Sequence, residues 1–502
     1  MSSSDLSALL SWFTRNGASY DTSSIGFKDF EAKEGGRGAV ALQDIPEEHV
    51  LFTIPRSLTL STRTSSLPNV FGMEDWKRHK LDEGWAGLIL CMMWERAQGS
   101  SSRWAEYLGT VYYGTLRTPT DPLCTDTLPT AFDTPMFWNA DDLKELKGTS
   151  IVVTEKLGKQ DAERDYNEKV LPAVTFRPEI FAAESIPLYY TLEQYHIMGS
   201  RILSRSFDVE RWEGEEDLNE VANTSSGSAM DVDIPESERE GTPEEEEEDP
   251  VDVSMVPMAD LLNARFGSEN AKLFHEDREL RMVSTKPIKA GEQIWNTYGD
   301  LPNAELLRRY GHVDLLPLTE DEVGNPGDVV EIRADLIVSA IAPDGLSFES
   351  AKERIDWYLE EGGDDVLVVE SDADLPQAMI LLIRLLTLPD DEWKKAKQKG
   401  KLPKAKADAQ ALGIASRVLE DRLSQYPTNI KDDEALLTAE SSLNKRHAIV
   451  VRLGEKRILS TALEKTQQLI AAEKTSNGGN KRKRPEGGHE DSSRKSRTKP
   501  RK

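Results

Sequence analysis

The chain has little cysteine and no long run of apolar residues. Only Cys91 and Cys124 occur among its 502 residues, too few for a disulfide framework or a cysteine-based zinc site, so the sequence favours a reducing compartment. The longest apolar run, AMILLIRLLTL at 378–388, contains an arginine and is well short of the roughly 20 residues that cross a bilayer. The N-terminus, MSSSDLSALLSWF, lacks the basic region of a secretory signal. We therefore expect no membrane partner and no secretion.

Several common catalytic motifs are also absent. The sequence has no glycine-rich phosphate loop, no G-x-G-x-x-G that opens a helix, no H-E-x-x-H and no G-x-S-x-G. Its seven histidines do not cluster at ligand spacing, so we expect no metal. Phosphoryl transfer, nicotinamide redox chemistry and metalloprotease activity therefore lose their usual support.

Charge is abundant but unevenly distributed along the chain, whose formal net charge is −27. Residues 208–252 contain 19 acidic and 2 basic side chains, whereas residues 474–502 contain 11 basic and 3 acidic ones. An acidic protein repels nucleic-acid phosphates and attracts basic polypeptides. We expect a basic protein partner and no direct nucleic-acid binding. The acidic stretch at about 213–250 is predicted to be a disordered loop, either a solvated spacer or a recruiter of basic substrates.

Hydrophobic periodicity predicts a small β domain that is interrupted by helices. The segment 36–59 has the pattern of a strand, a turn and a second strand, and the segment 280–299 repeats this layout. Residues 74–205 between them show helical spacing and predict a helical insertion. After about residue 335 three apolar stripes at helical spacing predict a helical domain.

Two polar motifs indicate a site that positions reactants. Asn263 stands in the apolar run VPMADLLNA, and the turn NTYG at 296–299 follows a strand-like segment. Asparagine and tyrosine are poor covalent catalysts, but their amide and hydroxyl groups hold a polar ligand well. The motifs therefore predict alignment of bound molecules rather than nucleophilic chemistry.

Four segments together resemble a known family. GGRGAVALQDI, VPMADLLNA, GEQIWNTYG and NAELLRRYG resemble, in order and spacing, the motifs of SET-domain protein lysine methyltransferases. They are most similar to the Rubisco large-subunit methyltransferase type, and within it to the fungal ribosomal lysine N-methyltransferase 4 group. VRLGEKRIL at 451–459 resembles the last helix of the C-terminal domain of that type. The resemblance implies an α+β SET fold with a pseudoknot-like crossing and a helical insertion, plus an all-α C-terminal domain.

The resemblance also implies domain boundaries, which are as follows: a SET domain at 24–299, with its insertion at about 74–205 and the acidic loop at about 213–250; a post-SET connection at 300–334; a helical substrate-binding domain at 335–473; and a disordered basic tail at 474–502. Two cysteines cannot build the zinc cluster that closes the site in many SET enzymes. The helical domain or the NAELLRRYG segment is expected to complete the lysine channel instead.

Site residues follow from the resemblance, position by position. Tyr298 is the expected catalytic residue, because the family's tyrosine hydroxyl orients the substrate amine. The positions expected to contact S-adenosylmethionine are Gly36, Arg37, Gly38, Arg205, Asn263, Ala264 and Tyr298. Asp260 and Tyr310 match positions that line the lysine channel in relatives.

Each of these residues also has a plainer structural interpretation. Tyr298 resembles a tyrosine at a strand end, Asn263 a turn cap, GGRG a hairpin turn and Arg205 a surface helix residue. Ala264 replaces the histidine found across the wider superfamily, which removes any contact made by an imidazole but not one made by the main chain.

Methyl transfer suits a site built from such residues. A lysine amine has a pKa of about 10.4 and must lose a proton before it attacks the methyl group. An apolar channel beside the sulfonium of S-adenosylmethionine lowers that pKa by desolvation and like-charge repulsion. Alignment and desolvation then supply most of the catalysis, and no strong general base and no metal are required.

We therefore expect a protein-lysine N-methyltransferase that monomethylates a large-subunit ribosomal protein. The alternatives are a non-catalytic SET scaffold that binds basic proteins, or a methyltransferase acting on histone lysine or on a cytoskeletal histidine. Retention of Tyr298 and Asn263 favours an enzyme over the scaffold.

The tail sequences KRKRP and RKSRTKPRK resemble a bipartite nuclear import signal. They imply an import receptor as a partner and the nucleus as the location. A nonspecific polyanion-binding tail is the alternative.

Removal of residues 474–502 tests the import signal. We expect the truncated protein to retain its activity in vitro, while a fluorescent fusion moves from the nucleus to the cytoplasm. Nuclear accumulation of the truncated fusion would contradict an import function of the tail.

Overall fold

The computed structural model describes residues 3–30, 37–109, 128, 132–153, 156–211, 251–318, 323–440 and 442–479. The chain divides into two compact units, which are described separately here: unit 1 comprises Met1–Glu331 and Gln425–Arg457, and unit 2 comprises Ile332–Ser424 and Ile458–Lys502. Across the described ranges, every helix is too short or too polar to cross a membrane.

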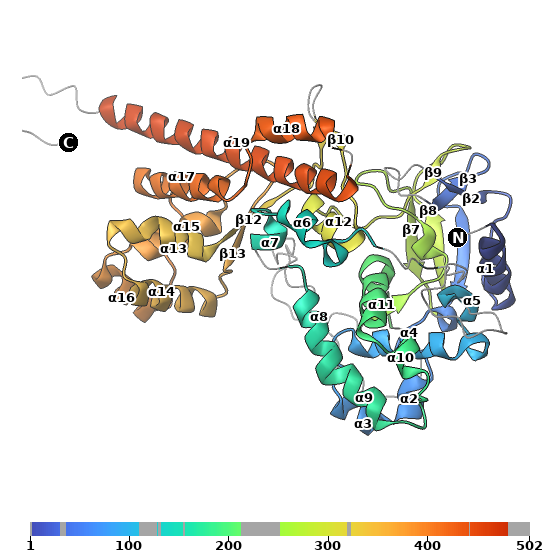
Figure 1. Ribbon diagram of the computed structural model, residues 1–502. Helices are drawn as coiled ribbons and strands as arrows, with labels where there is room; N and C mark the ends of the chain where they lie inside the picture. The colour runs from blue at the N-terminus through green and yellow to red at the C-terminus, as the bar shows by residue number, and fades with distance from the viewer. Residues whose placement is uncertain are drawn as a thin grey trace, which may run out of the picture. The chain divides into compact units, whose positions relative to one another are not determined.

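The strands of unit 1 (Figure 1) are β1 (Ser19–Tyr20), β2 (Ile25–Asp29), β3 (Arg37–Ala41), β4 (Val50–Pro55), β5 (Ser206–Glu210), β6 (Val251–Met255), β7 (Ala271–His275), β8 (Glu279–Ser284), β9 (Gln293–Ile294), β10 (Leu316–Pro317) and β11 (Val323–Gly324). They form a four-stranded sheet of order β1-β4-β8-β7, a three-stranded sheet of order β2-β3-β9, and the pairs β5-β6 and β10-β11. The two strands predicted within 36–59 therefore belong to different sheets and do not pair with each other.

The pairing of β3 with β9 joins the two β segments that are far apart in sequence. Ala39 pairs with Ile294 and Val40 with Gln293, both antiparallel. Ala39, Val40 and Ile294 are buried, so this part of β3 is covered on both faces, as in a strand inside a core. This pairing brings the GGRG and NTYG motifs to the same part of unit 1.

Strands β5 and β6 pair antiparallel on either side of the acidic stretch. The pairing runs from Ser206 with Met255 to Glu210 with Val251. The predicted loop at 213–250 lies outside the described residues, but the chain enters and leaves it through paired strands. The stretch is thus an insertion within one unit, as the composition suggested.

The helices of unit 1 are α1 (Ser3–Arg15), α2 (Leu67–Phe71), α3 (Met73–Arg78), α4 (Ala86–Ala97), α5 (Ala105–Leu108), α6 (Ala140–Lys144), α7 (Ser150–Val153), α8 (Lys159–Asp165), α9 (Leu171–Phe176), α10 (Ile186–Tyr189), α11 (Leu192–Arg205), α12 (Asn303–Tyr310) and α18 (Ile430–Ala439). Those from α2 to α11 correspond to the predicted helical insertion. In Figure 1, α2, α3, α9 and α10 gather away from the strands, whereas α4 and α11 lie nearer to them.

Helix α11 shows why the insertion folds as it does. Thr191 caps its first turn by accepting a hydrogen bond from the amide of Gln194 at 3.2 Å, which satisfies one of the free N–H groups of a helix start. Tyr195, Met198 and Ile202 recur at helical spacing and are all buried in the main core. Because α11 leads directly into β5, this packing fixes the position of Arg205, its last residue.

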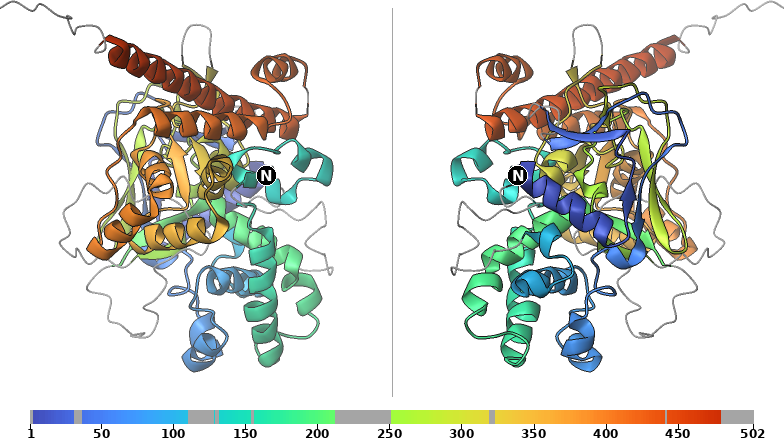
Figure 2. Two further views of the ribbon diagram at one scale, coloured as in Figure 1. Left: turned by 90° about the vertical axis from the view of Figure 1, so that its left-hand side faces the viewer. Right: turned by 90° about the vertical axis from the view of Figure 1, so that its right-hand side faces the viewer.

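Helix α1 covers the β1 edge of the same core. Its residues Leu9, Trp12 and Phe13 are each at most 3% exposed, and the helix lies beside the strands in the right-hand view of Figure 2. The indole Nε1 of Trp12 donates to the carbonyl of Arg103 at 2.8 Å, which satisfies its polar group.

Unit 2 contains α13 (Ala334–Ile341), α14 (Phe348–Glu360), β13 (Val366–Val369), α15 (Gln377–Thr387), α16 (Asp390–Lys399) and α17 (Ala409–Ser424). β12 (Val330–Arg333) crosses the boundary between the units. The strand β13 adds to the helices predicted for this region. The guanidinium of Arg354, 2% exposed, donates to the carbonyls of Leu385, Leu386 and Leu388 at 2.7–3.0 Å and so satisfies the end of α15.

The long helix α19 (Leu443–Gly479) begins in unit 1 and continues into unit 2. It extends six residues into the region predicted as a tail from 474 onward, and residues 480–502 lie outside the described part. Contacts also assign Gln425–Arg457 to unit 1, although the sequence suggested one helical domain over 335–473. Because α19 is continuous across both units, its sequence has no feature that marks where unit 1 ends and unit 2 begins.

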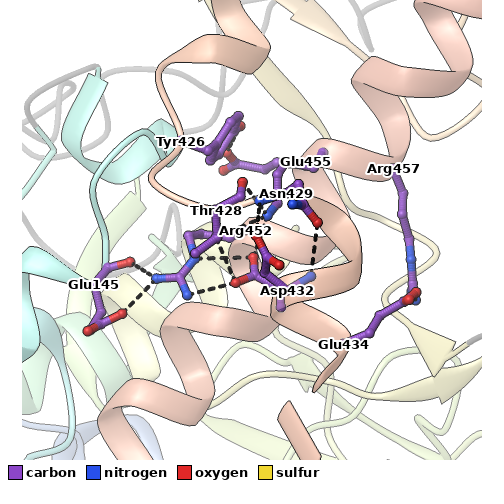
Figure 3. Close-up of polar contacts among 11 residues, drawn as sticks. Glu145, Tyr426, Thr428, Asn429, Asp432, Glu434, Arg452, Glu455 and Arg457 are labelled. Atoms are coloured by element: carbon purple, nitrogen blue, oxygen red, sulfur yellow. Dashed lines mark hydrogen bonds and ion pairs between the residues drawn. The ribbon is translucent and has the colours of Figure 1, made fainter. Parts of the chain in front are cut away.

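Three charged residues of the VRLGEKRIL motif, Arg452, Glu455 and Lys456, are buried, and Figure 3 shows the polar contacts of this region. Arg452 and Asp433 are both fully buried, and the Arg452 Nη2 donates to Asp433 Oδ1 at 2.9 Å. Lys456 donates to the other carboxylate oxygen, and Glu145 accepts from Arg452 Nη1 at 3.0 Å. The group ties α18 and α19 to the chain after α6, all within unit 1.

A second carboxylate of the motif makes a similar connection. Glu455, 2% exposed, accepts the backbone N–H of Ser150 at 2.9 Å and the hydroxyl of Tyr426. Burial alone would raise the pKa of Asp433, but hydrogen bonds from Arg452, Lys456 and Thr428 hold it below its usual value. These buried charges are therefore paired, as buried charges must be.

Substitution of Asp433 by alanine should destabilise unit 1 strongly. The buried Lys456 would lose its counterion and Arg452 would keep only Glu145, and breaking a buried pair typically costs about 3–5 kcal/mol of unfolding free energy. The neighbouring Glu434→Ala is a matched control, because Glu434 forms a surface ion pair with Arg457, and loss of such a pair costs about 1 kcal/mol or less. Urea denaturation measures both, and equal losses would contradict the buried network.

Candidate functional site

The two polar motifs cross in the structure. The backbone N–H of Asn296 donates to the carbonyl of Asn263 at 2.9 Å, and Ala264 forms a parallel bridge with Asn296. Segments that are separated along the chain by β7 and β8 thus lie side by side. This is the crossing expected from the motif order.

A pair of side-chain amides lies next to the crossing, directly over Gly38. The Asn263 Nδ2 donates to Gln293 Oε1 at 2.7 Å. A Cβ atom at position 38 would stand 2.4 Å from Gln293 Oε1 and 2.6 Å from Asn263 Nδ2. Glycine at this position is required by close approach, so the motif is more than a hairpin turn.

A buried polar cluster lies on the other side of the site. Asp260 is 4% exposed, and its Oδ2 accepts the hydroxyl of Tyr107 at 2.7 Å. Arg205, at the end of α11, donates to the main-chain carbonyl of Asp260. Within the described part of the chain, Asp260 Oδ1 and Arg205 Nε are buried without a hydrogen-bond partner. Buried unpaired polar atoms are costly, so this cluster can accept further polar groups.

Burial controls the ionisation of this cluster. It raises the pKa of Asp260 to about 6, against the opposing effects of Arg205 and of the Tyr107 hydroxyl. Asp260 is therefore charged at neutral pH and takes up a proton in weakly acidic solution. The pKa of Tyr107 lies well above its usual value, first because of burial and then because of Asp260.

Tyr298 and Tyr310 form an aromatic stack beside the crossing. Their rings are parallel within 2°, with centroids 3.9 Å apart, and His312 lies 6.1 Å from each. Burial raises the pKa of Tyr298, the nearby Arg205 lowers it and Asp260 raises it. The Tyr298 hydroxyl thus keeps its proton at neutral pH, and these interactions place it near the Arg205 and Asp260 cluster.

A small cleft opens beside Tyr298. Its wall combines both motif segments, the start of α12 and the turn that follows it. The lining residues are Ala264, Arg265, Phe266, Gly267, Thr297, Tyr298, Gly299, Asp300, Leu301, Leu306, His312 and Asp314. Asp314 anchors this wall by accepting the backbone N–H of Phe266 at 3.0 Å.

Backbone strain occurs immediately before Asp260. Met258 is 2% exposed and has a φ of 78°, a conformation that costs a non-glycine residue about 1–3 kcal/mol and is found mainly at functional sites. It begins the short 3-10 helix Ala259–Leu261. The strain turns the chain so that Asp260 points into the buried cluster.

The structure groups most of the predicted site residues but separates one side chain. Gly38 meets Asn263, Arg205 meets Asp260, and Tyr298 stacks on Tyr310, as described above, while Ala264 lines the cleft. The Arg37 guanidinium pairs with Asp29 on the adjacent strand at 2.9 and 3.1 Å. Gly36 lies outside the described residues. The ligand roles of these residues stay predictions.

Three residues of the site were not identified from the sequence. Gln293 stands within GEQIW, five residues before Tyr298, where a polar residue inside an apolar strand is a usable signal. His312 follows Tyr310 by two residues and could have been noticed for that reason. Tyr107 has no local signal, because its partner Asp260 is distant in sequence.

Comparison with known proteins gives concordant results. A family model described as Rubisco LSMT substrate-binding matches residues 334–459. N-lysine methyltransferase setd6 from Xenopus laevis is 27% identical over 458 residues, covering 86% of this chain and 89% of that protein. Ribosomal lysine N-methyltransferase 4 from Saccharomyces cerevisiae is 29% identical over 380 residues, covering 72% of this chain and 67% of that protein.

Solved structures agree along nearly the whole chain. The structure of Rubisco LSMT bound to AdoMet superimposes with a TM-score of 0.62 at 17% identity and covers 96% of this chain and 97% of that chain. The SET domain of LSMT bound to lysine and AdoHcy gives 0.61 at 17% identity, with coverages of 94% and 93%. The chain has the SET fold of the LSMT structures, and its residues 334–459 match the Rubisco LSMT substrate-binding family. The resemblance and the fold class predicted from the motifs are confirmed.

The contact between Gly38 and the amide pair of this SET protein can be tested by adding one methyl group. Gly38→Ala would push Asn263 or Gln293 away, and we expect the unfolding free energy to fall by about 1–3 kcal/mol. Gly413→Ala is the matched control, since nothing lies within 4 Å of the added atom and alanine favours the α17 interior by up to about 1 kcal/mol. Urea denaturation should therefore give changes of opposite sign, and a stable Gly38→Ala protein would contradict the close approach.

Proposed function

We propose that this protein transfers a methyl group from S-adenosylmethionine to a lysine side chain of a basic protein. The observation that carries the proposal is the crossing, which brings Tyr298 and the Asn263–Ala264 segment to one cleft. The named relatives support it, since both are lysine methyltransferases. A scaffold that only binds proteins would not need a strained, buried Asp260 cluster beside this tyrosine.

The residues present fit S-adenosylmethionine, which supplies an activated methyl group. The unpaired Nε of Arg205 is a donor suited to the carboxylate of that molecule by a charge-assisted bond. The Asn263 amide and the main chain of Ala264 lie at the crossing and offer further polar groups. Gly38 lets the β3 backbone approach the same place.

The chain's own groups can prepare the substrate amine. The stacked rings of Tyr298 and Tyr310 give an aromatic wall that favours a neutral amine by desolvation. Because the Tyr298 hydroxyl keeps its proton, it can donate or accept one directional hydrogen bond that orients the nitrogen. His312 in the cleft stays neutral, since burial lowers its pKa against the effect of Asp314, so it adds no competing charge.

For the substrate, we propose a large-subunit ribosomal protein that is monomethylated at one lysine. The yeast relative is named a ribosomal lysine N-methyltransferase, ribosomal proteins are basic, and the net charge of −27 favours encounter with basic partners. The tail sequence KRKRP supports action in the nucleus after binding of an import receptor.

Identification of the substrate tests this function directly. Purified protein and S-adenosylmethionine with a labelled methyl group should be incubated with extracts of cells that lack the gene. We expect label in one basic protein, and mass spectrometry should find monomethyl-lysine in a large-subunit ribosomal protein. Label in a histone or on a histidine would overturn the ribosomal assignment, and no label in any protein would overturn the enzyme.

Tyr298→Phe tests the aligned hydroxyl within the same assay. We expect turnover to fall by roughly 10²-fold or more, the cost of one aligned polar group in a transition state, with fold and binding of S-adenosylhomocysteine retained. Tyr20→Phe on β1, away from the cleft residues, is the control and should leave turnover unchanged. Near-normal turnover of Tyr298→Phe would remove this hydroxyl from the mechanism.

A further inference from the structure

Tyr107 contacts the candidate site although it is distant from every motif. It lies in α5, is 1% exposed, and donates its hydroxyl to Asp260 Oδ2 at 2.7 Å. Asp260 is buried as well, so water does not compete for this bond. A hydrogen bond to a charged group in such surroundings is among the stronger ones in proteins.

The Tyr107 ring is fixed from behind by the N-terminal helix. Trp12 of α1 stacks on it with an interplanar angle of 7° and a centroid distance of 6.0 Å. Trp12 is itself held through its Nε1, which donates to the carbonyl of Arg103 just before α5. Helices α1 and α5 lie together in Figure 1. The position of the Tyr107 hydroxyl is therefore fixed by packing in the core, not by contacts in the cleft.

The charged and titratable groups around Asp260 and Tyr107 come from three places in the chain. Arg205 and Arg201 belong to α11, Tyr298 follows β9, and Tyr107 belongs to α5. Arg205 donates to the main-chain carbonyl of Asp260, so it stabilises the carboxylate through space. The Tyr107 hydroxyl bonds to the carboxylate itself.

We propose that Tyr107 is a positioning residue of the lysine site: it holds Oδ2 of an ionised Asp260 and leaves Oδ1 as the acceptor for an N–H of the incoming substrate amine. Oδ1 is the oxygen that lacks a hydrogen-bond partner among the described residues, and Asp260 acts on Tyr298 electrostatically. The inference rests on the proposed function and adds a residue that no motif of the sequence includes.

The hydrogen bond matters because the carboxylate is only just ionised at neutral pH. Burial raises the pKa of Asp260 to about 6, and Arg205 and the Tyr107 hydroxyl oppose a further rise. Since a hydrogen bond donated to a carboxylate favours its charged form, loss of the hydroxyl should raise this pKa toward 7. The enzyme would then lose its ionised Asp260 near neutral pH.

The test is the pH dependence of kcat/KM for Tyr107→Phe between pH 5.5 and 9. We expect the limb assigned to Asp260 to move up by about one pH unit. The variant should lose roughly five-fold at pH 6 relative to the wild type and little at pH 8.5, with the loss mainly in KM. A loss that is equal at every pH would overturn the proposal, because it would show a merely structural role.

Two further variants complete the test. Tyr166→Phe is the matched control: its buried hydroxyl donates to the carbonyl of Tyr190 at 2.8 Å, which does not titrate, so its pH profile should not move. Asp260→Asn removes the titrating group, and Tyr107→Phe should cause no additional pH shift in that background. A shift that persists there would overturn the proposal.

A stability measurement tests the same link without activity. The folded pKa of Asp260, about 6, exceeds its ordinary value of 3.8, so its contribution to stability is fully present below pH 3.8 and is lost as pH rises through 6. The unfolding free energy is measured against pH and compared with that of Asp260→Asn. The decrease due to Asp260 should be complete near pH 6 in the wild type and near pH 7 in Tyr107→Phe. Identical curves would overturn the proposal. Absence of methyl transfer in the wild type would overturn the proposed function alone.

Discussion

The site depends on one backbone hydrogen bond and the bridge beside it, where the Asn296 amide meets the Asn263 carbonyl. A main-chain crossing of this kind fixes two segments at once without using their side chains. Asn263 is therefore free to pair with Gln293, and Tyr298, two residues after Asn296, is held at a set distance from Ala264. If the two segments separated, the amide pair, the cleft and the aromatic stack would no longer be held in fixed positions relative to one another.

Both units pair several of their buried polar groups, whereas the site keeps two such groups unpaired side by side. Arg452, Asp433 and Lys456 neutralise one another, and Arg354 satisfies the carbonyls at the end of α15. By contrast, Arg205 Nε and Asp260 Oδ1 remain unpaired among the described residues, and Met258 is strained. Unpaired polar groups that lie together beside a strained backbone are expected where a ligand completes the structure.

Local sequence predicted those parts of the site that a short segment determines. Asn263 and Tyr298 stand out because polar residues interrupt apolar patterns, and the order of the motifs predicted that their segments meet. Sequence could not predict that β3 and β4 join different sheets, because both segments have an equally good strand pattern. Their sheets are determined by their partners, since β3 pairs with β9 and β4 pairs with β8. The sequence did not indicate Tyr107 for the same reason, because its role depends on a contact with Asp260, which lies 153 positions later in the chain. The motif at 451–459 likewise predicted a helix but not the burial of Arg452, Glu455 and Lys456.

The pairing of β5 with β6 has a consequence for how this protein can change over time. Arg205 lies just before β5, and Asp260 lies shortly after β6. The outermost pair of these two strands, Glu210 with Val251, holds together the two ends of the segment that connects β5 to β6. The entropy of closing a loop grows only with the logarithm of its length, and a doubling costs about 0.6 kcal/mol. The stretch between these strands can therefore lengthen, shorten or change its composition while the Arg205 to Asp260 contact is preserved. Changes of sequence or length in this segment are separated from Arg205 and Asp260 by the paired strands β5 and β6.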